Sequence, residues 1–168
     1  NYLRYLVDFH RLSHPDSLGP KSRVQIDGWD NLDKAFSAGK GVILVGLHFG
    51  NWDLAAAAVA KKRYPLNVIV EDVPNSQLNQ MAQEMRNSLG MKTIPLRGPQ
   101  QLVRALKRNE MIALLIDQPN ADASIPTEFF GHQAMIPTGA AALALRTGAK
   151  IIPGALVRLP GHSYKGFI

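Results

Sequence analysis

Short apolar runs alternate along the chain with longer amphipathic or alanine-rich stretches. Compact apolar runs are typical of buried strands, whereas apolar positions three and four apart are typical of helices. The predicted strands of this series are residues 41–46, 66–72, 91–96, 111–117 and 149–159. The predicted helices are residues 31–39, 52–63, 75–90, 99–109 and 138–148. This order predicts an α/β fold with a mostly parallel central sheet flanked by helices.

The remaining segments complete this picture. The opening stretch NYLRYLVDFHRL predicts an amphipathic helix, and residues 23–27 alternate like a short strand. Residues 118–137 are predicted to form a long loop, and PGHS turns the chain into a last strand. Within the 168 residues there is no internal repeat and no linker, so one domain with a sizeable core is expected.

Composition restricts the class of protein. A hydrophobic fraction of 46% and a charged fraction of 19% are typical of a folded globular chain. The absence of cysteine excludes disulfides and thiolate metal sites. No run of about 18 apolar residues occurs, so no membrane-spanning helix is predicted within these residues.

The charge balance favours an anionic partner. The chain has 19 Lys and Arg against 13 Asp and Glu, a net charge of +6. Nucleic acid, an anionic membrane leaflet and an acidic carrier or cofactor are the partners that such a charge attracts. The basic clusters at 61–63 and 104–108 contain no interleaved aromatic residues, and no nucleic-acid-binding motif occurs, so nucleic acid is not expected.

Polar residues follow four successive predicted strands. In open α/β sheets, ligands bind at the carboxyl ends of the strands. The side chains at these ends are His48, Glu71 with Asp72, Arg97, and Asp117 with Gln118. If the strands are parallel, these residues line one edge of the sheet, which is the expected position of a binding or catalytic site.

His48 and Asp53, in the stretch LHFGNWD, form the most specific candidate pair for catalysis. Gly50 permits a tight turn and Asn51 can cap the following helix, so His48 stays in the turn while Asp53 enters the first helical turn. The carboxylate can then hydrogen-bond one imidazole nitrogen and leave the other as a general base. The alternative is a histidine packed in an ordinary turn, with an aspartate capping the helix.

Other reaction types lack their residues. There is no G-x-S-x-G and no cysteine to supply a nucleophile, no H-E-x-x-H to bind zinc, and no glycine-rich phosphate loop after a strand. No metal site is therefore expected. A base without an enzyme nucleophile points to transfer onto a substrate hydroxyl or amine, or to hydrolysis.

The motif HFGNWD resembles the His-x4-Asp motif of glycerolipid-type acyltransferases. The chain is more specifically similar to the bacterial lipid A biosynthesis (late) acyltransferase family, which includes phosphatidylinositol mannoside acyltransferases. The blocks that carry the resemblance are, in order, GVILVGLHFGNWDLAA, RNSLGMKTIPLRG, LVRALKRNEMIALLIDQP and EFFGHQAMIPTGAAALALRTGAKIIPGALVRLP. The family has an N-terminal membrane anchor and a longer C-terminal part, so residues 1–168 are expected to be a single acyltransferase domain, a fragment of a longer chain.

The resemblance implies an O-acyltransferase with a glycerolipid-acyltransferase-like fold. A fatty acyl group would move from acyl carrier protein or coenzyme A to a hydroxyl of a membrane glycolipid of the lipid A precursor type. His48 would act as the general base with Asp53, and no cofactor is expected beyond the acyl donor. The expected place is the cytoplasmic face of the bacterial inner membrane, with the anionic membrane surface as a partner and the opening helix at its interface.

Further roles follow from the same resemblance. Glu71 and Glu128 match acidic positions of the mannoside-acyltransferase branch, where an acidic residue contacts the histidine. Asp117 and Gln118 match the DQ of the lipid A branch. Arg97 is a candidate for binding the acceptor phosphate or stabilising the tetrahedral intermediate. Phe129 and Phe130 are candidates for lining the acyl-chain pocket.

Three alternatives stay open at this stage. The acceptor can be a phosphatidylinositol mannoside or another glycolipid. His48 can activate water instead, which would make the protein a thioester or ester hydrolase. The chain can also be a non-catalytic lipid-binding module.

Overall fold

A five-stranded parallel sheet lies at the centre of the protein, with strand order β4-β3-β5-β2-β8. The computed structural model describes residues 2–11, 24–71, 74–95, 99–119 and 123–168. The sheet consists of β2 (Val42–Gly46), β3 (Leu66–Val70), β4 (Lys92–Pro95), β5 (Met111–Leu115) and β8 (Lys150–Pro153). The predicted α/β class with a mostly parallel sheet flanked by helices is therefore confirmed.

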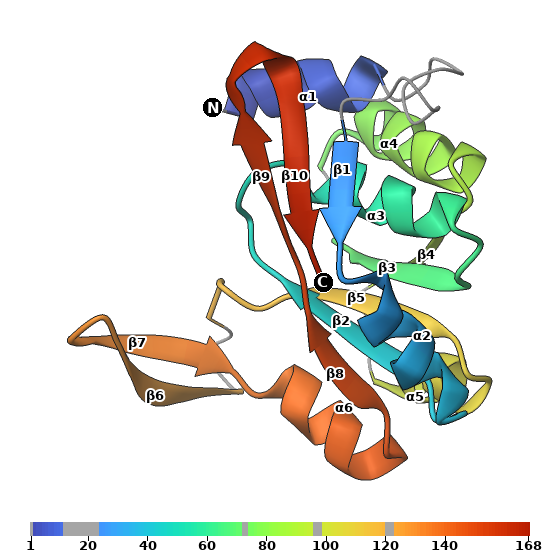
Figure 1. Ribbon diagram of the computed structural model, residues 1–168, viewed down its shortest axis with the longest axis vertical. Helices are drawn as coiled ribbons and strands as arrows, with labels where there is room; N and C mark the ends of the chain where they lie inside the picture. Colours follow the sequence, from blue (N-terminus) through green and yellow to red (C-terminus); the bar gives the residue numbers. More distant parts are fainter. Residues whose placement is uncertain (1, 12–23, 72–73, 96–98, 120–122) are drawn as a thin grey trace.

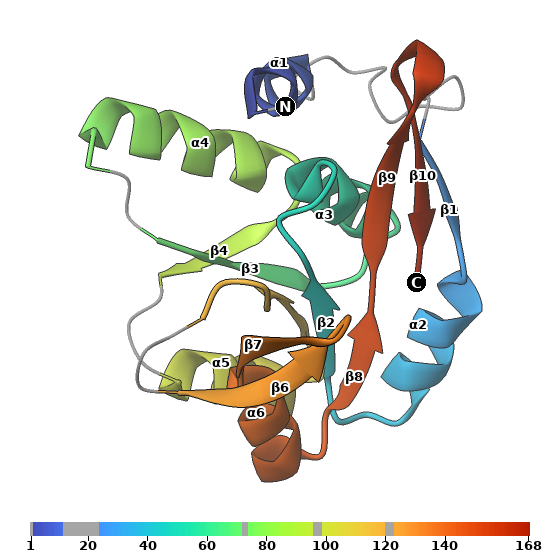
Figure 2. The same cartoon turned by 90° about the vertical axis from the view of Figure 1, so that its left-hand side faces the viewer.

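Helices cover both faces of this sheet. In Figure 2, α3 and α4 lie on one side of the sheet and α5 and α6 lie on the other. Successive side chains of a strand point to opposite faces, so Val42 joins one hydrophobic core and Ile43 the other. The helices are α1 (Tyr2–Arg11), α2 (Trp29–Ser37), α3 (Trp52–Lys61), α4 (Ser76–Ser88), α5 (Gln100–Lys107) and α6 (Gly139–Thr147).

A second sheet stands beside α3 (Figure 1). It contains β1 (Val24–Asp27), β9 (Ala155–Leu159) and β10 (Ser163–Phe167), with β10 parallel to β1 and antiparallel to β9 across the short helix η1 (Pro160–His162). The predicted single strand 149–159 is therefore wrong, because Gly154 separates β8 in the central sheet from β9 in the second sheet. A Cβ atom at Gly154 would lie 3.2 Å from Cδ1 of Leu44, so a glycine suits this crossing.

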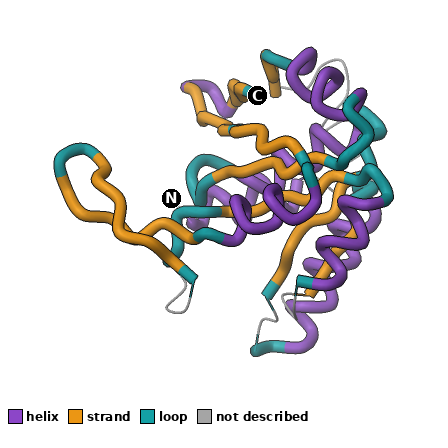
Figure 3. The backbone as a smooth tube through the Cα atoms, turned by 90° about the horizontal axis from the view of Figure 1, so that it is seen from below, coloured by secondary structure: helices purple, strands orange, loops and turns teal. Residues whose placement is uncertain are grey.

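The prediction of a long loop over residues 118–137 is also wrong. β6 (Ser124–Phe129) and β7 (His132–Pro137) form an antiparallel hairpin in which Phe129 is paired with His132. Phe130 and Gly131 form its turn with φ of 50° and 75°, and positive values at both positions are those that a type I′ hairpin turn requires. The hairpin projects from the rest of the protein (Figures 1 and 3).

Helix α1 matches the predicted amphipathic helix, but its apolar residues divide between two faces. Phe9 is buried in the core, whereas Leu3, Leu6 and Val7 are 77%, 40% and 50% exposed. No helix in the described part of the chain is long and apolar enough to cross a lipid bilayer.

Candidate active site

The turn between β2 and α3 carries His48, and two neighbouring residues determine its shape. Gly50 has a φ of +70°, and a Cβ atom there would lie 1.7 Å from the carbonyl oxygen of Leu156, so the turn requires glycine. Asn51 is buried and caps α3, because its Oδ1 accepts a hydrogen bond from the backbone N–H of Leu54 at 3.0 Å. The predicted roles of Gly50 and Asn51 are confirmed.

Asp117, which follows β5, holds His48 by two contacts. Nδ1 of His48 lies 2.8 Å from Oδ1 of Asp117. The backbone N–H of His48 donates to Oδ2 of the same carboxylate, also at 2.8 Å. A carboxylate beside Nδ1 favours the tautomer that carries its proton there, which leaves the lone pair on Nε2 to accept a proton.

The electrostatics of this pair favour a charged carboxylate. Partial burial raises the pKa of Asp117, but the hydrogen bonds from the side chain and backbone of His48 lower this pKa by more, so the net shift is downward. Asp117 is therefore an anion at neutral pH. A fixed anion beside the ring stabilises the imidazolium that forms when Nε2 takes a proton.

The strand order explains why Asp117 meets His48. Gly46 on β2 is paired with Leu115 on the adjacent parallel strand β5, and each functional residue stands two positions beyond its strand end. Glu71 follows β3, which lies on the far side of β5, about 10 Å from β2 at the usual strand spacing. Glu71 and Gln118 are exposed at this edge of the sheet, and Arg97 lies outside the described residues.

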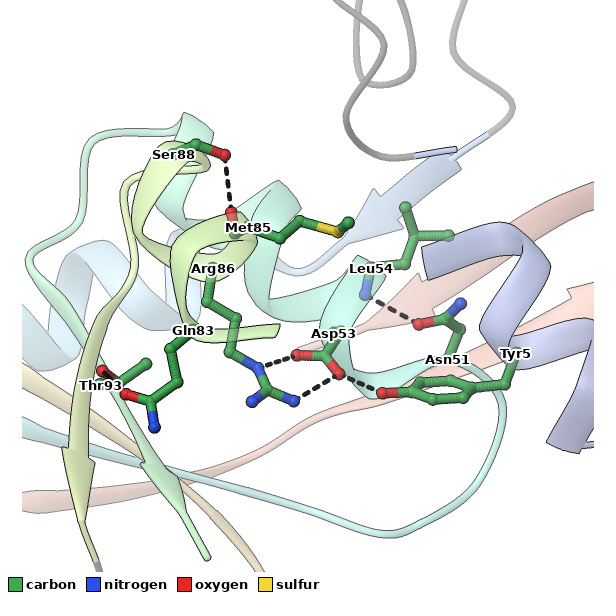
Figure 4. Close-up of polar contacts among 9 residues, drawn as sticks. All are labelled: Tyr5, Asn51, Asp53, Leu54, Gln83, Met85, Arg86, Ser88 and Thr93. Carbon is green, nitrogen blue, oxygen red and sulfur yellow. Dashed lines mark hydrogen bonds and ion pairs between the residues drawn. The ribbon is translucent and has the colours of Figure 1, made fainter. Parts of the chain in front are cut away.

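Asp53 has different partners from those predicted, because it points towards α4 and α1 (Figure 4). Arg86 on α4 donates to its carboxylate from Nε at 2.8 Å and from a terminal nitrogen at 3.1 Å. The hydroxyl of Tyr5 on α1 donates to the same carboxylate. The sequence predicted that Asp53 would hydrogen-bond the His48 ring, whereas in the structure that carboxylate belongs to Asp117.

The Asp53–Arg86 pair is deeply buried. The Asp53 side chain is 3% exposed and the Arg86 side chain 17%. Burial lowers the pKa of Arg86, but the hydrogen bond and charge of Asp53 raise it by more, so the guanidinium stays charged. Sequence reasoning missed Arg86 and Tyr5, since an isolated arginine or tyrosine in a predicted helix has no signal that distinguishes it from a surface residue.

Trp52 contacts His48 from the first residue of α3. The two rings meet edge to face with centroids 5.0 Å apart, and the ring of Tyr5 also stacks on the indole, with centroids 4.4 Å apart. Sequence reasoning did not assign Trp52 a role either, although it lies inside the motif.

The hairpin places three predicted site residues away from this turn. Glu128 on β6 is exposed and paired with Gln133, and it is Asp117 that holds the His48 ring. Phe129 and Phe130 stand at the hairpin tip, 61% and 87% exposed, with their rings edge to face at 4.6 Å. Neither phenylalanine is among the residues that line the apolar cavity beside the His48 turn, and their role in an acyl-chain pocket stays a prediction.

A narrow apolar cavity of about 70 Å³ lies beside the His48 turn. Its walls come from β2, α3, β5 and the second sheet, and four of its residues belong to the turn or flank it: Gly46, Leu47, Phe49 and Trp52. Among the described residues, no group of three or more histidine, cysteine or acidic side chains is placed to bind a metal. The arrangement can therefore offer a base, a paired carboxylate and an apolar recess within one region.

Known proteins resemble the chain over nearly all of its length. The profile of the family described as bacterial lipid A biosynthesis acyltransferase matches residues 1–168. A phosphatidylinositol mannoside acyltransferase of Mycobacterium tuberculosis (strain CDC 1551 / Oshkosh) is 31% identical over 161 residues, which cover 91% of this chain and 51% of the relative. The enzyme of the same name from Mycolicibacterium smegmatis is 30% identical over 158 residues, covering 91% and 52%.

The chain thus spans about half the length of the curated relatives it matches. The match covers the turn with His48, the strand before Asp117 and the helix with Arg86, since the whole chain lies within the family profile. The chain belongs to the bacterial lipid A biosynthesis acyltransferase family.

Proposed function

We propose that this chain carries the catalytic centre of an O-acyltransferase that acylates a hydroxyl of a membrane glycolipid. The donor is a fatty acyl thioester of acyl carrier protein or coenzyme A. The site has a glycerolipid-acyltransferase-like arrangement in this proposal. The observation that carries it is the double contact of Asp117 with His48, which supports a base on Nε2 beside an apolar cavity.

The proposed reaction has two steps. Nε2 of His48 takes the proton of the acceptor hydroxyl while its oxygen attacks the thioester carbonyl carbon, and a tetrahedral oxyanion forms. The carbon–sulfur bond then breaks, and the leaving thiolate receives the proton from the imidazolium. Asp117 stabilises the imidazolium between the steps. Arg97 stays the sequence-based proposal for binding a phosphate or the oxyanion.

Asp53 is proposed to act indirectly. Its carboxylate ties the first turn of α3 to α4 and α1 through Arg86 and Tyr5, so it keeps the His48 turn in place without touching the ring. General-base catalysis contributes about 10²- to 10⁴-fold in rate, and that share is assigned to His48 with Asp117.

The apolar cavity is proposed to receive the acyl chain. Gly46 lines it, and a Cβ atom there would lie 3.4 Å from Cδ2 of Leu115 and 3.5 Å from the carbonyl oxygen of Gly154, which is ordinary contact. Gly46→Ala should therefore fold and, by adding a methyl group to the cavity wall, should shift the preference towards shorter acyl donors. Unchanged preference across a series of acyl-CoA lengths would contradict this placement of the chain.

The acceptor class has two candidates. The family description names lipid A biosynthesis, and the relatives at 30–31% identity are named phosphatidylinositol mannoside acyltransferases. The relatives favour a mannoside acceptor. Assays with a lipid A precursor and with phosphatidylinositol mannoside, each with palmitoyl-CoA, separate the two.

The central experiment compares His48→Ala with His132→Ala, a change at an exposed histidine of the hairpin. We expect His48→Ala to lower acyl transfer by at least about 10²-fold and His132→Ala to leave it unchanged. Full activity of His48→Ala would reject the proposed base. Thioester consumption that does not require the glycolipid would identify a hydrolase instead.

The proposed location is the cytoplasmic face of the inner membrane. Support comes from the net charge of +6 and from the outer face of α1, where Leu3 and Val7 are exposed. Such a helix binds anionic surfaces through apolar burial and charge. Vesicle sedimentation should show binding to phosphatidylglycerol vesicles that weakens in Leu3→Ser/Val7→Ser, and equal binding of both proteins would contradict it.

A further inference from the structure

Four aromatic rings form a row that ends at His48. The ring centroids are 6.0 Å apart for Phe9 and Tyr5, 4.4 Å for Tyr5 and Trp52, and 5.0 Å for Trp52 and His48. These spacings fall within or at the edge of the range of favourable aromatic pairs, and each aromatic contact restricts the rotation of the next ring. The row connects α1 to the turn between β2 and α3.

The His48 ring has two contacts, one with a carboxylate and one with an indole. Asp117 holds Nδ1, and the indole of Trp52 stands at 71° to the imidazole plane. Asp117 alone fixes one atom of the ring, and the ring could still tilt about that contact. The indole therefore restricts the direction in which Nε2 points.

Tyr5 is the neighbour that fixes Trp52. Its ring stacks on the indole at an angle of 22°, and its hydroxyl donates to the buried carboxylate of Asp53. The ring of Tyr5 is thus held by the indole, and its hydroxyl is held by the Asp53 carboxylate, which also binds Arg86.

Helix α1 has anchors that do not involve Tyr5. The hydroxyl of Tyr164 on β10 donates to Asp8, and Arg158 on β9 lies 3.3 Å from the same carboxylate. Phe9 is buried in the core. Because these contacts hold α1 in place, a change at Tyr5 should alter the row of rings without releasing the helix.

We propose that Tyr5 is a positioning residue, through which α1 sets the orientation of His48 by way of the Trp52 ring. The inference rests on the proposed function, because it requires His48 to be the base. Proton transfer needs the acceptor oxygen about 2.6–3.2 Å from Nε2, so a tilted ring slows the chemical step while substrate binding is retained. The expected signature is a lower kcat at an unchanged KM.

The experiment compares three variants in the full chain. Tyr5→Leu removes the stacked ring and should lower kcat for acyl transfer from palmitoyl-CoA by about tenfold or more, with KM unchanged. Tyr5→Phe keeps the stack and should restore most of the kcat. The matched control is Tyr64→Leu. Tyr64 also stacks on aromatic rings, and its hydroxyl donates to an aspartate, Asp33, at 2.6 Å. These contacts involve α2 and not the row of rings that ends at His48.

A spectroscopic measurement follows the ring itself. The imidazole resonances of His48, identified by their loss in His48→Ala, carry a ring-current shift from Trp52. This shift should change in Tyr5→Leu and in Trp52→Leu, and should persist in Tyr5→Phe and Tyr64→Leu. The kcat losses of Tyr5→Leu and Trp52→Leu should also be less than additive in the double variant, because both act on the same ring.

The outcomes separate the two proposals. An unchanged kcat and an unchanged His48 shift in Tyr5→Leu would overturn the positioning role, and so would a kcat loss of equal size in Tyr64→Leu. If His48→Ala is inactive in that same series, the proposed function stands and only this inference fails. If His48→Ala is fully active, the proposed function fails and this inference fails with it.

Discussion

The two aspartates around His48 occupy opposite surroundings. Asp53 is 3% exposed and its carboxylate binds groups from two helices, whereas the Asp117 side chain is 32% exposed and its carboxylate binds His48. Asp53 is close to His48 in sequence and Asp117 is distant. The difference shows that the neighbouring residue maintains the turn, while a residue from another strand contacts the ring that is proposed to move the proton.

The largest expected effect comes from removing the partner of Asp53, the buried aspartate. Arg86→Ala leaves the Asp53 carboxylate buried without its guanidinium, so we expect the free energy of unfolding to fall by about 3–5 kcal/mol. Urea denaturation measures the change. Arg104→Ala, at an exposed position of α5, should change the free energy by no more than about 0.5 kcal/mol, and a similar loss in both variants would contradict the special role of the pair.

The second-largest expected effect comes from a change at Asp117, the more exposed aspartate. Asp117→Asn removes the charge beside Nδ1 and should lower kcat for acyl transfer by about 10²-fold or more. Because both partners are partly exposed, the free energy of unfolding should change by no more than about 1 kcal/mol. Steady-state kinetics and urea denaturation of the same preparation check both statements. A large loss of stability with an unchanged kcat would reverse the assignment of the two aspartates.

A third carboxylate, that of Glu110, lies at the other end of β5 and can be compared with the two aspartates. A hydrogen bond from Arg108 lowers the pKa of Glu110 to about 2, against an opposing effect of burial and with further help from Asn67 and Lys92. The lowered pKa stabilises the fold at pH above the ordinary value of 4.5, and this stability is lost as the pH falls towards 2.

Glu110→Gln should therefore remove about 1–2 kcal/mol at neutral pH, after allowance for solvent screening, and should flatten the loss between pH 4.5 and 2. Chemical denaturation across this pH range measures it. Glu84→Gln on the exposed face of α4 is the control, and an unchanged acid profile in Glu110→Gln would refute the prediction. The kcat should not change, because Glu110 is at the opposite edge of the sheet from His48.

The smallest expected effect concerns Asn51, the N-cap of α3 in the His48 turn. Asn51→Ala removes the hydrogen bond to the Leu54 N–H and should lower the free energy of unfolding by about 1 kcal/mol. Asn75→Ala removes the matching cap of α4, at an exposed position, and should cost less. Thermal denaturation of both variants tests this order, and a larger loss in Asn75→Ala would contradict it.

The sequence was sufficient for the features that depend on local pattern. The parallel sheet follows from alternating apolar runs and helices, and the turn follows from Gly50 and Asn51 within one short stretch. The common edge of His48 and Asp117 also follows, because parallel strands end on the same side.

The features that depend on strand order and helix packing could not be read from the sequence. The spacing of His48 and Asp53 allowed a hydrogen bond between them, but only the position of α4 decides that Arg86 binds Asp53. Likewise, only the adjacency of β2 and β5 selects Asp117 over Glu71. The hairpin was missed because most of its residues are exposed and its strands lack a long apolar run.

The pairing of β2 with β5 also has a consequence for how the site forms during folding. His48 and Asp117 are 69 positions apart, and three helix–strand units (α3–β3, α4–β4 and α5–β5) lie between them in the chain. Such non-local pairing carries a loop-closure cost that is repaid late, so it slows folding. The His48–Asp117 contact is therefore a reporter of the β2–β5 pairing: a chain emerging from the ribosome has the motif histidine long before it has the carboxylate that orients it.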